Sequence, residues 1–270
     1  MAYNAYIYVI FFTYINSANH ECHSESEIST DFDEIKDGTI CMANRDFVKG
    51  EQFTIYYGKR SNADLLVHNG FVYSSPTSND TEASKNPKIH PNSMVLKIGI
   101  AKTDQFAQNK YDLLDQLSIP KSGGHFILST EEKPFDNILL AFLRVLCMTT
   151  KEEFCYFCDT CIKSDAQHDD ERNSGDKVRD LLNNTLSTHP ELDAKVYKYL
   201  ETRCNLLLRS YSTTLEEDLE SLNIDEKAEG NPANQTLNRK HCILLRSQEK
   251  QILQHVIKYC RPIVDMPQST

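Results

Sequence analysis

Residues 74–93 divide the chain into two parts of different character, and this division constrains the fold more than any single motif. The stretch holds three prolines with several serines and asparagines, and its apolar residues follow no period. Such a composition is typical of a linker. Short strand-like segments precede it, and segments with helical periodicity follow it. We therefore expect an α+β protein with a β-rich part followed by a mainly α-helical part.

The part before the linker predicts short strands and one short helix. Residues 21–38 are polar and indicate a loop with weak strand character at its edges, whereas residues 39–44 can form a short strand. Residues 53–57 alternate as a strand does. Ser61 can begin a short helix that Gly70 ends.

The part after the linker predicts one strand-like run over 94–100 and then several helices. Residues 138–146 are apolar nearly all round, which predicts a buried helix. The expected helix starts are Thr103, Asp136, Thr188 with Pro190, and Thr213 with Glu216 as a capping box. The last helix has its apolar stripe at Ile252, Leu253, Val256, Ile257 and Cys260.

Charge and cysteine content exclude some classes of protein. The 270 residues carry a net charge of -10, and binding of nucleic acid would need a clustered basic face. The nine cysteines are an odd number and do not form a framework of short regular spacings, which indicates reduced intracellular thiols rather than disulfides. We expect no nucleic-acid partner, a monomer, and a cytoplasmic location that can extend to the nucleus.

The first fifteen residues are apolar and aromatic, but they lack the marks of a targeting segment. A signal peptide has a basic n-region, and this chain has no Lys or Arg before Lys36. The run is also too short to span a bilayer. We interpret it as a buried strand, or as the abnormal start of a truncated gene model, and expect no membrane association. A membrane-tethered protein stays as an alternative that rests on residues 5–15 alone.

Two motifs in the first part point to a known family. One is the stretch from Gly50 to Asp64, which includes Tyr57-Gly58-Lys59-Arg60-Ser61-Asn62-Ala63, and the other is the earlier pair Asn19-His20. Together they resemble the C-terminal half of a SET methyltransferase core, in which an asparagine–histidine turn precedes a strand that ends in a tyrosine. A complete SET core has a long further segment before that turn, including a Gly-rich cofactor strand. We therefore expect an N-terminally truncated chain that lacks the cofactor half.

Three segments of the second part extend the resemblance. Residues 139–149, 206–218 and 244–253 are similar to segments of the Rubisco-methyltransferase-type substrate-binding domain. Within this group the chain is similar to the actin-histidine N-methyltransferases. The domains implied are an unmatched apolar N-terminus over 1–18, the C-terminal part of a SET domain over 19–73, a linker over 74–93, the helical substrate-binding domain over 94–262, and a tail over 263–270.

The resemblance implies a cofactor, S-adenosyl-L-methionine, and residues that contact it. Asn19 and His20 match the pair that contacts the cofactor. Asn69 lies where the family has a serine near the cofactor, and Asn16 stands where the family usually has an aspartate. These departures put the corresponding contacts in doubt.

The resemblance also implies a substrate pocket and a protein substrate, best matched by a histidine of actin. Ile55, Tyr57 and Arg60 match positions that line this pocket, with Tyr57 in the catalytic position. A tyrosine hydroxyl can align the nucleophile, and an arginine can clamp the peptide that bears it. A lysine target stays open, because lysine methyltransferases share this architecture.

Other interpretations of the same residues stay open. From spacing alone, Asn19 could be a turn residue, His20 a surface histidine and Tyr57 a core aromatic. The alternative at the level of the whole chain is a non-catalytic protein-binding module that keeps the substrate-recognition domain.

Cys155, Cys158 and Cys161, with His168 nearby, form a second candidate pattern. A zinc site would need tetrahedral closure by these four side chains. Alternatively, the cysteines continue a helix over 151–162 and contribute to its apolar stripe as small hydrophobic residues. We favour the helix and expect no metal site.

Overall fold

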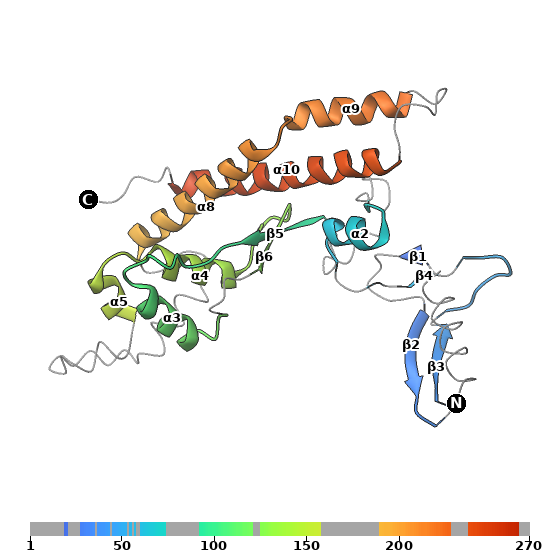
Figure 1. Ribbon diagram of the computed structural model, residues 1–270, viewed down its shortest axis with the longest axis horizontal. Helices are drawn as coiled ribbons and strands as arrows, with labels where there is room; N and C mark the ends of the chain where they lie inside the picture. The colour runs from blue at the N-terminus through green and yellow to red at the C-terminus, as the bar shows by residue number, and fades with distance from the viewer. Residues whose placement is uncertain are drawn as a thin grey trace. The chain divides into compact units, whose positions relative to one another are not determined.

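A computed structural model describes residues 19–20, 28–35, 37–43, 45–52, 54–55, 57, 60–73, 92–120, 125–157, 189–227 and 237–264. The chain forms two compact units, Met1–Pro91 and Asn92–Thr270 (Figure 1). Within the described residues, the first unit holds short strands and the helix α2 (Asn62–Asn69), and the second unit is mainly helical. This arrangement confirms the expected α+β fold class.

The described residues of the first unit form two small sheets. Strand β1 (Asn19–His20) pairs in parallel with β4 (Thr54–Ile55). Strand β2 (Ile28–Asp33) pairs antiparallel with β3 (Gly38–Ala43) along its full length. The expectation of a loop over 21–38 was therefore wrong for β2. These polar residues can form a strand because β3 supplies hydrogen-bond partners for the β2 backbone along the whole hairpin.

The second unit is built from one small sheet and six described helices. Strand β5 (Ser93–Lys97) pairs antiparallel with β6 (His125–Ser129). Helices α8 and α10 lie side by side, and α9 packs on α10 (Figure 1). The helices are α3 (Ala107–Gln116), α4 (Asn137–Cys147), α5 (Lys151–Phe157), α8 (Pro190–Ser210), α9 (Leu215–Lys227) and α10 (Leu237–Val264).

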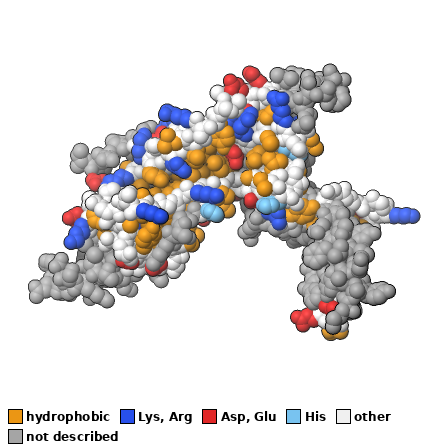
Figure 2. Space-filling model, viewed as in Figure 1, with side chains coloured by type: hydrophobic (Ala, Val, Ile, Leu, Met, Phe, Trp, Pro, Cys, Tyr) orange, Lys and Arg blue, Asp and Glu red, His pale blue; other side chains and the backbone are white. Residues whose placement is uncertain are grey.

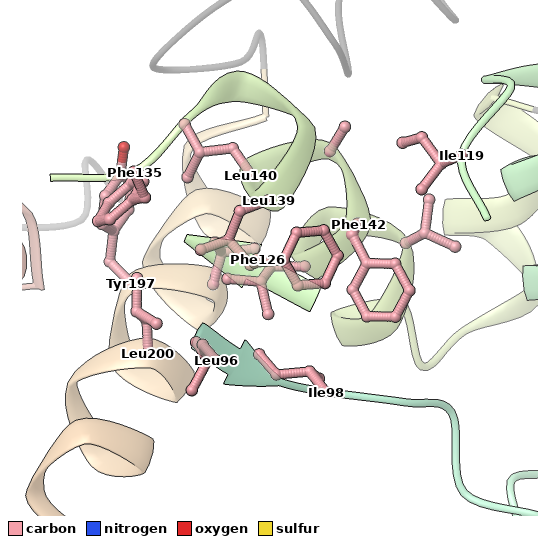
Figure 3. Close-up of a cluster of buried hydrophobic side chains, with 14 of the residues drawn as sticks. Leu96, Ile98, Ile119, Phe126, Phe135, Leu139, Leu140, Phe142, Tyr197 and Leu200 are labelled. Carbon is pink, nitrogen blue, oxygen red and sulfur yellow. The ribbon is translucent and has the colours of Figure 1, made fainter. Parts of the chain in front are cut away.

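One continuous hydrophobic core holds the second unit together. Leu96 of β5 and Phe126 of β6 belong to this core, and the Phe126 ring lies 4.9 Å from the Phe142 ring of α4 between centroids (Figure 3). Helix α4 is buried from Leu139 to Val145, as its apolar sequence predicts. The five residues of the predicted α10 stripe are likewise all buried.

In the second unit, the predicted helix starts at Asp136 and Pro190 were correct and two others were displaced; Thr188, predicted together with Pro190, lies outside the described residues. Asp136 accepts a hydrogen bond from the Leu139 N–H and caps α4, and Pro190 is the first residue of α8. Helix α3 begins at Ala107 rather than near Thr103. The displacement arises because Asp104 accepts the Phe106 N–H and holds a turn ahead of the helix.

The capping box of α9 lies one residue beyond the predicted pair of Thr213 and Glu216. Thr214 accepts the Glu217 N–H at 3.2 Å, and the Glu217 carboxylate accepts the Thr214 N–H at 2.8 Å. Thr213 instead donates to Asp218 at 2.9 Å. A tertiary contact therefore selects between two neighbouring Thr-x-x-Glu patterns.

A buried ion pair joins α4 to α8. Arg144 is 0% exposed and Asp193 2%, and Arg144 Nε donates to Asp193 Oδ1 at 2.8 Å. Burying two charges is costly unless each has a well-placed partner. The pair therefore specifies how the two helices align within an apolar core.

A second charged cluster joins α9 to α10 around Asp218, which is 1% exposed. Arg246 forms an ion pair with Asp218 through its guanidinium, and the Lys250 ammonium donates to Asp218 at 2.6 Å and to the Thr213 carbonyl at 2.6 Å. Burial acts to raise the pKa of Asp218, but hydrogen bonds from Arg246, Lys250 and Thr213 outweigh it and lower the pKa to about 2. The carboxylate thus stays charged inside the unit.

Outward-facing apolar residues are also present on the second unit, including Leu206, Leu219 and Leu237. Hydrophobic side chains gather over the side where α8 and α10 lie (Figure 2). Within the part of the chain that the structure describes, no helix combines the length and the apolar character that a membrane span needs.

We predict that Asp193→Asn destabilises the second unit by about 3 kcal/mol, because it leaves the Arg144 charge buried without this carboxylate. Urea denaturation followed by circular dichroism measures the change. Lys198→Gln is the matched control, since it removes a 63%-exposed partner of Glu201 and should change stability by less than about 0.5 kcal/mol. Equal effects of the two substitutions would contradict the role of the buried pair.

We also predict an acid-dependent loss of stability that arises from Asp218. Its folded pKa lies below the ordinary value of 3.8, so its contribution is present above that value and is lost as the pH falls toward about 2. Between pH 5 and pH 2 the wild-type chain should lose about 2 kcal/mol more stability than Asp218→Asn. Parallel pH profiles of the two proteins would show that the carboxylate contributes nothing.

Candidate active site

The parallel pairing of β1 and β4 brings the first two predicted site segments together. Asn19 lies opposite Thr54 and His20 opposite Ile55. The backbone of the asparagine–histidine pair therefore runs beside the strand that leads to Tyr57. This places the predicted cofactor residues next to one of the predicted pocket residues.

Arg60 connects two other predicted site residues, Tyr57 and Asn69. Its Nε donates to the Tyr57 carbonyl oxygen at 3.1 Å, and its Nη1 donates to Asn69 Oδ1 at 3.4 Å. Arg60 is exposed and Tyr57 is partly buried. The arginine thus spans from the end of the β4 segment to the end of the following helix.

Helix α2 (Asn62–Asn69) supports this arrangement, and its sequence fixes both ends. Ser61 and Asp64 form a capping box, as the predicted start at Ser61 requires. Gly70 ends the helix with φ of 79°, and its N–H donates to the Leu66 carbonyl. Leu65 is fully buried and anchors the helix to the unit.

Asn62 is a residue of this site that sequence reasoning did not single out. It is 1% exposed. Its Nδ2 donates to the Tyr73 carbonyl and its Oδ1 accepts the Tyr73 N–H, both at 2.9 Å. The signal available in the sequence was its place directly after Arg60-Ser61 in the motif, but the partner at Tyr73 is visible only in the structure.

The turn before β4 is held by a local charged contact. Arg45 donates to Glu51 at 2.7 Å, and its guanidinium lies 3.9 Å from the centroid of the Phe47 ring. The hydrogen bond from Arg45, followed by that from the Val48 N–H, lowers the pKa of Glu51. Glu51 therefore stays charged and holds the turn that leads into β4.

Two of the three motif segments of the second unit, residues 206–218 and 244–253, meet in one cluster. Tyr211 donates to Glu249 at 2.7 Å, and Thr213 and Asp218 contact Lys250. Each of these contacts joins residues 206–218 to residues 244–253. These two segments therefore stabilise the packing of the second unit.

Burial makes Cys147, Cys204 and Cys260 of the second unit poor nucleophiles. Cys147, Cys204, Cys242 and Cys260 are free thiols. Burial raises the pKa of Cys147 to about 11 and that of Cys204 to about 12, so neither ionises at neutral pH. Burial raises the pKa of Cys260 as well.

The cysteine pattern at Cys155, Cys158 and Cys161, with His168, lies outside the residues whose side chains are described. Helix α5 is described only to Phe157, and Phe154 and Phe157 are both buried. Among the described residues, no group of three or more His, Cys, Asp or Glu side chains could hold a metal ion. The choice between thiols and zinc stays a prediction.

Comparison with known proteins decides the family. The family model described as Rubisco LSMT substrate-binding matches residues 101–253, more than half of the chain. The chain belongs to the Rubisco LSMT substrate-binding family. The predicted similarity of the second part to this domain is therefore confirmed.

Relatives of this family member include protein methyltransferases. The actin-histidine N-methyltransferases of Callithrix jacchus and Danio rerio are each 34% identical to it over 236 residues, and that of Homo sapiens is 32% identical. These matches cover 87% of this chain and 34% of each relative. The predicted resemblance is confirmed, and the chain spans about a third of the length of the curated relatives it matches.

Solved structures share the fold. A Rubisco LSMT bound to sinefungin and monomethyllysine is 20% identical with a TM-score of 0.63, and it covers 94% of this chain and 50% of that chain. The SET domain of LSMT bound to MeLysine and AdoHcy is 20% identical with a TM-score of 0.64, over 92% of this chain and 48% of that chain. This family member therefore has an LSMT-like SET and substrate-binding fold.

We predict that Gly70→Ala weakens α2 through backbone strain. An added Cβ would meet nothing within 4 Å, so the cost of about 1 kcal/mol comes from the positive φ alone. Gly70→Asn should destabilise α2 less than Gly70→Ala, because asparagine tolerates the left-handed region of backbone conformation. Hydrogen exchange of the α2 amides in the full chain measures the effect. Exchange as slow in Gly70→Ala as in the wild type would contradict the assignment.

Proposed function

We propose that this chain contributes to a SET-family protein methyltransferase that transfers a methyl group from S-adenosyl-L-methionine to a histidine of actin or an actin-like protein. The observation that carries the proposal is the gathering of Tyr57, Arg60 and Asn69 next to the paired strands that hold Asn19-His20. The relatives named as actin-histidine N-methyltransferases support the choice of target.

In this proposal, three residues hold one side of S-adenosyl-L-methionine. Strand β1 offers backbone groups beside β4, and Asn69 offers a neutral amide that already accepts a hydrogen bond from Arg60. When bound, the cofactor would supply an electrophilic methyl group on its sulfonium. Asn19, His20 and Asn69 are the residues proposed to hold it, and no metal is needed for this chemistry.

The remaining residues would act on the protein substrate. The nucleophile is an uncharged nitrogen, and a histidine with an ordinary pKa of about 6.5 is largely neutral at cellular pH. The Tyr57 hydroxyl would orient that nitrogen, while Ile55 lines the pocket. Arg60 lies on the exposed side and would hold the peptide through its planar set of donors.

Methyl transfer to two matched peptides tests the proposal. The extended protein for this assay joins residues 19–270 to the part of the Danio rerio relative upstream of its matched segment. One substrate is an actin peptide with its histidine, and the other has lysine at that position. The proposal expects label from methyl-tritiated cofactor on the histidine peptide only. Preference for lysine would favour a lysine methyltransferase, and no transfer with retained actin binding would favour a binding module.

We predict that Tyr57→Phe lowers kcat about 10-fold or more and changes the peptide KM little, because it removes only the orienting hydroxyl. Arg60→Ala should chiefly raise the peptide KM, by about 10-fold, because it removes charged hydrogen-bond donors. Steady-state kinetics of the extended protein separate the two effects.

Tyr111→Phe and Arg239→Ala are matched controls in the second unit and should leave both constants unchanged. An unchanged kcat in Tyr57→Phe would refute the orienting role. A peptide KM unaffected by Arg60→Ala would refute the clamp.

A further inference from the structure

The hydrogen bonds of Asn62 close residues 62–73 into a loop. Helix α2 leads away from Asn62, Gly70 reverses the chain, and Tyr73 returns to the first residue of the helix. Val72, next to Tyr73, is buried at 7% exposure. The returning segment is therefore fixed at its end by a buried side chain.

The Asn62 side chain is matched to this task by its chemistry. A carboxamide offers one donor and one acceptor side by side, and the Tyr73 backbone offers the complementary acceptor and donor. A carboxylate of the same size could accept the N–H but would face the Tyr73 carbonyl with a second acceptor. Losing these two hydrogen bonds at a buried position is costly, because the Tyr73 N–H and carbonyl must then find other partners.

A contact between two proposed site residues joins the segment just before this loop to the end of α2. Arg60 precedes Asn62 by two positions, and Asn69 precedes the Gly70 reversal. Their hydrogen bond at 3.4 Å is long, so it does not hold the two ends of α2 by itself. The two shorter bonds to Tyr73 are the stronger restraint on where the helix end and the returning segment lie.

We propose that Asn62 is a positioning residue: its buried amide clamps Tyr73 and thereby sets Asn69 and the returning segment for the cofactor. This inference rests on the proposed function. Asn62 touches neither cofactor nor peptide in this account and acts through the residues it holds.

The first arm of the test uses the full chain and does not require activity. Hydrogen exchange resolved at Tyr73 should be about 10-fold or more faster in Asn62→Ala than in the wild type, because the N–H loses its acceptor. Asn62→Asp keeps an acceptor, so its exchange rate at Tyr73 should lie between those of the wild type and Asn62→Ala. Asn205→Ala is the matched control. It removes a side-chain amide that donates to a carbonyl within α8, and it should leave the exchange rate at Tyr73 unchanged. Unchanged exchange in Asn62→Ala would overturn the clamp.

The second arm measures kinetics with the extended protein described above. Asn62→Ala should raise the KM for S-adenosyl-L-methionine about 5-fold or more while the peptide KM changes less than 2-fold. Equal changes in both constants, or none, would overturn the positioning role even if exchange at Tyr73 increases. An inactive extended wild type would instead refute the proposed function, and the exchange measurement would still decide whether the clamp exists.

Discussion

The buried pair of Arg144 and Asp193 is the interaction on which the alignment of the second unit depends. It is buried beside a large apolar cluster, and a misaligned α4 and α8 would leave two desolvated charges apart. The Asp218 cluster acts in the same way between α9 and α10. Hydrophobic burial thus drives folding of this unit, whereas the two charged contacts select the packing among the alternatives that burial alone would allow.

The candidate site of the first unit is held by different means. Arg60 and Asn62 make contacts that are close in sequence, to Tyr57, Asn69 and Tyr73. The link to Asn19-His20 depends instead on the short parallel pairing of β1 with β4. Residues 57–73 are therefore held together by contacts that are local in sequence, whereas the position of Asn19-His20 depends on a pairing between distant parts of the chain.

Sequence reasoning predicted what local chemistry determines. Asp136, Ser61 and Pro190 mark helix starts because capping and φ preference act within a single turn. It placed the α9 capping box one residue early, because Lys250 draws Thr213 into a contact that only the tertiary fold supplies. Strands β2 and β6 were missed for a similar reason, since each is short and stabilised by its partner strand. The clamp by Asn62 likewise depends on where the chain returns. The roles of Asn19, His20, Ile55, Tyr57, Arg60 and Asn69 stay proposals.

The central claim is that residues 19–73 supply part of a binding site for S-adenosyl-L-methionine. Isothermal titration calorimetry of the cofactor into three proteins tests it most directly: residues 1–270 as they stand, the extended protein, and the extended protein with His20→Ala. The account predicts weak or no binding to the first, because a partial site leaves much of the ligand unburied and polar groups unpaired. It predicts one site per chain in the second and a loss of about 10-fold or more in affinity in the third. Low-micromolar binding to residues 1–270, or affinity unaffected by His20→Ala, would contradict it.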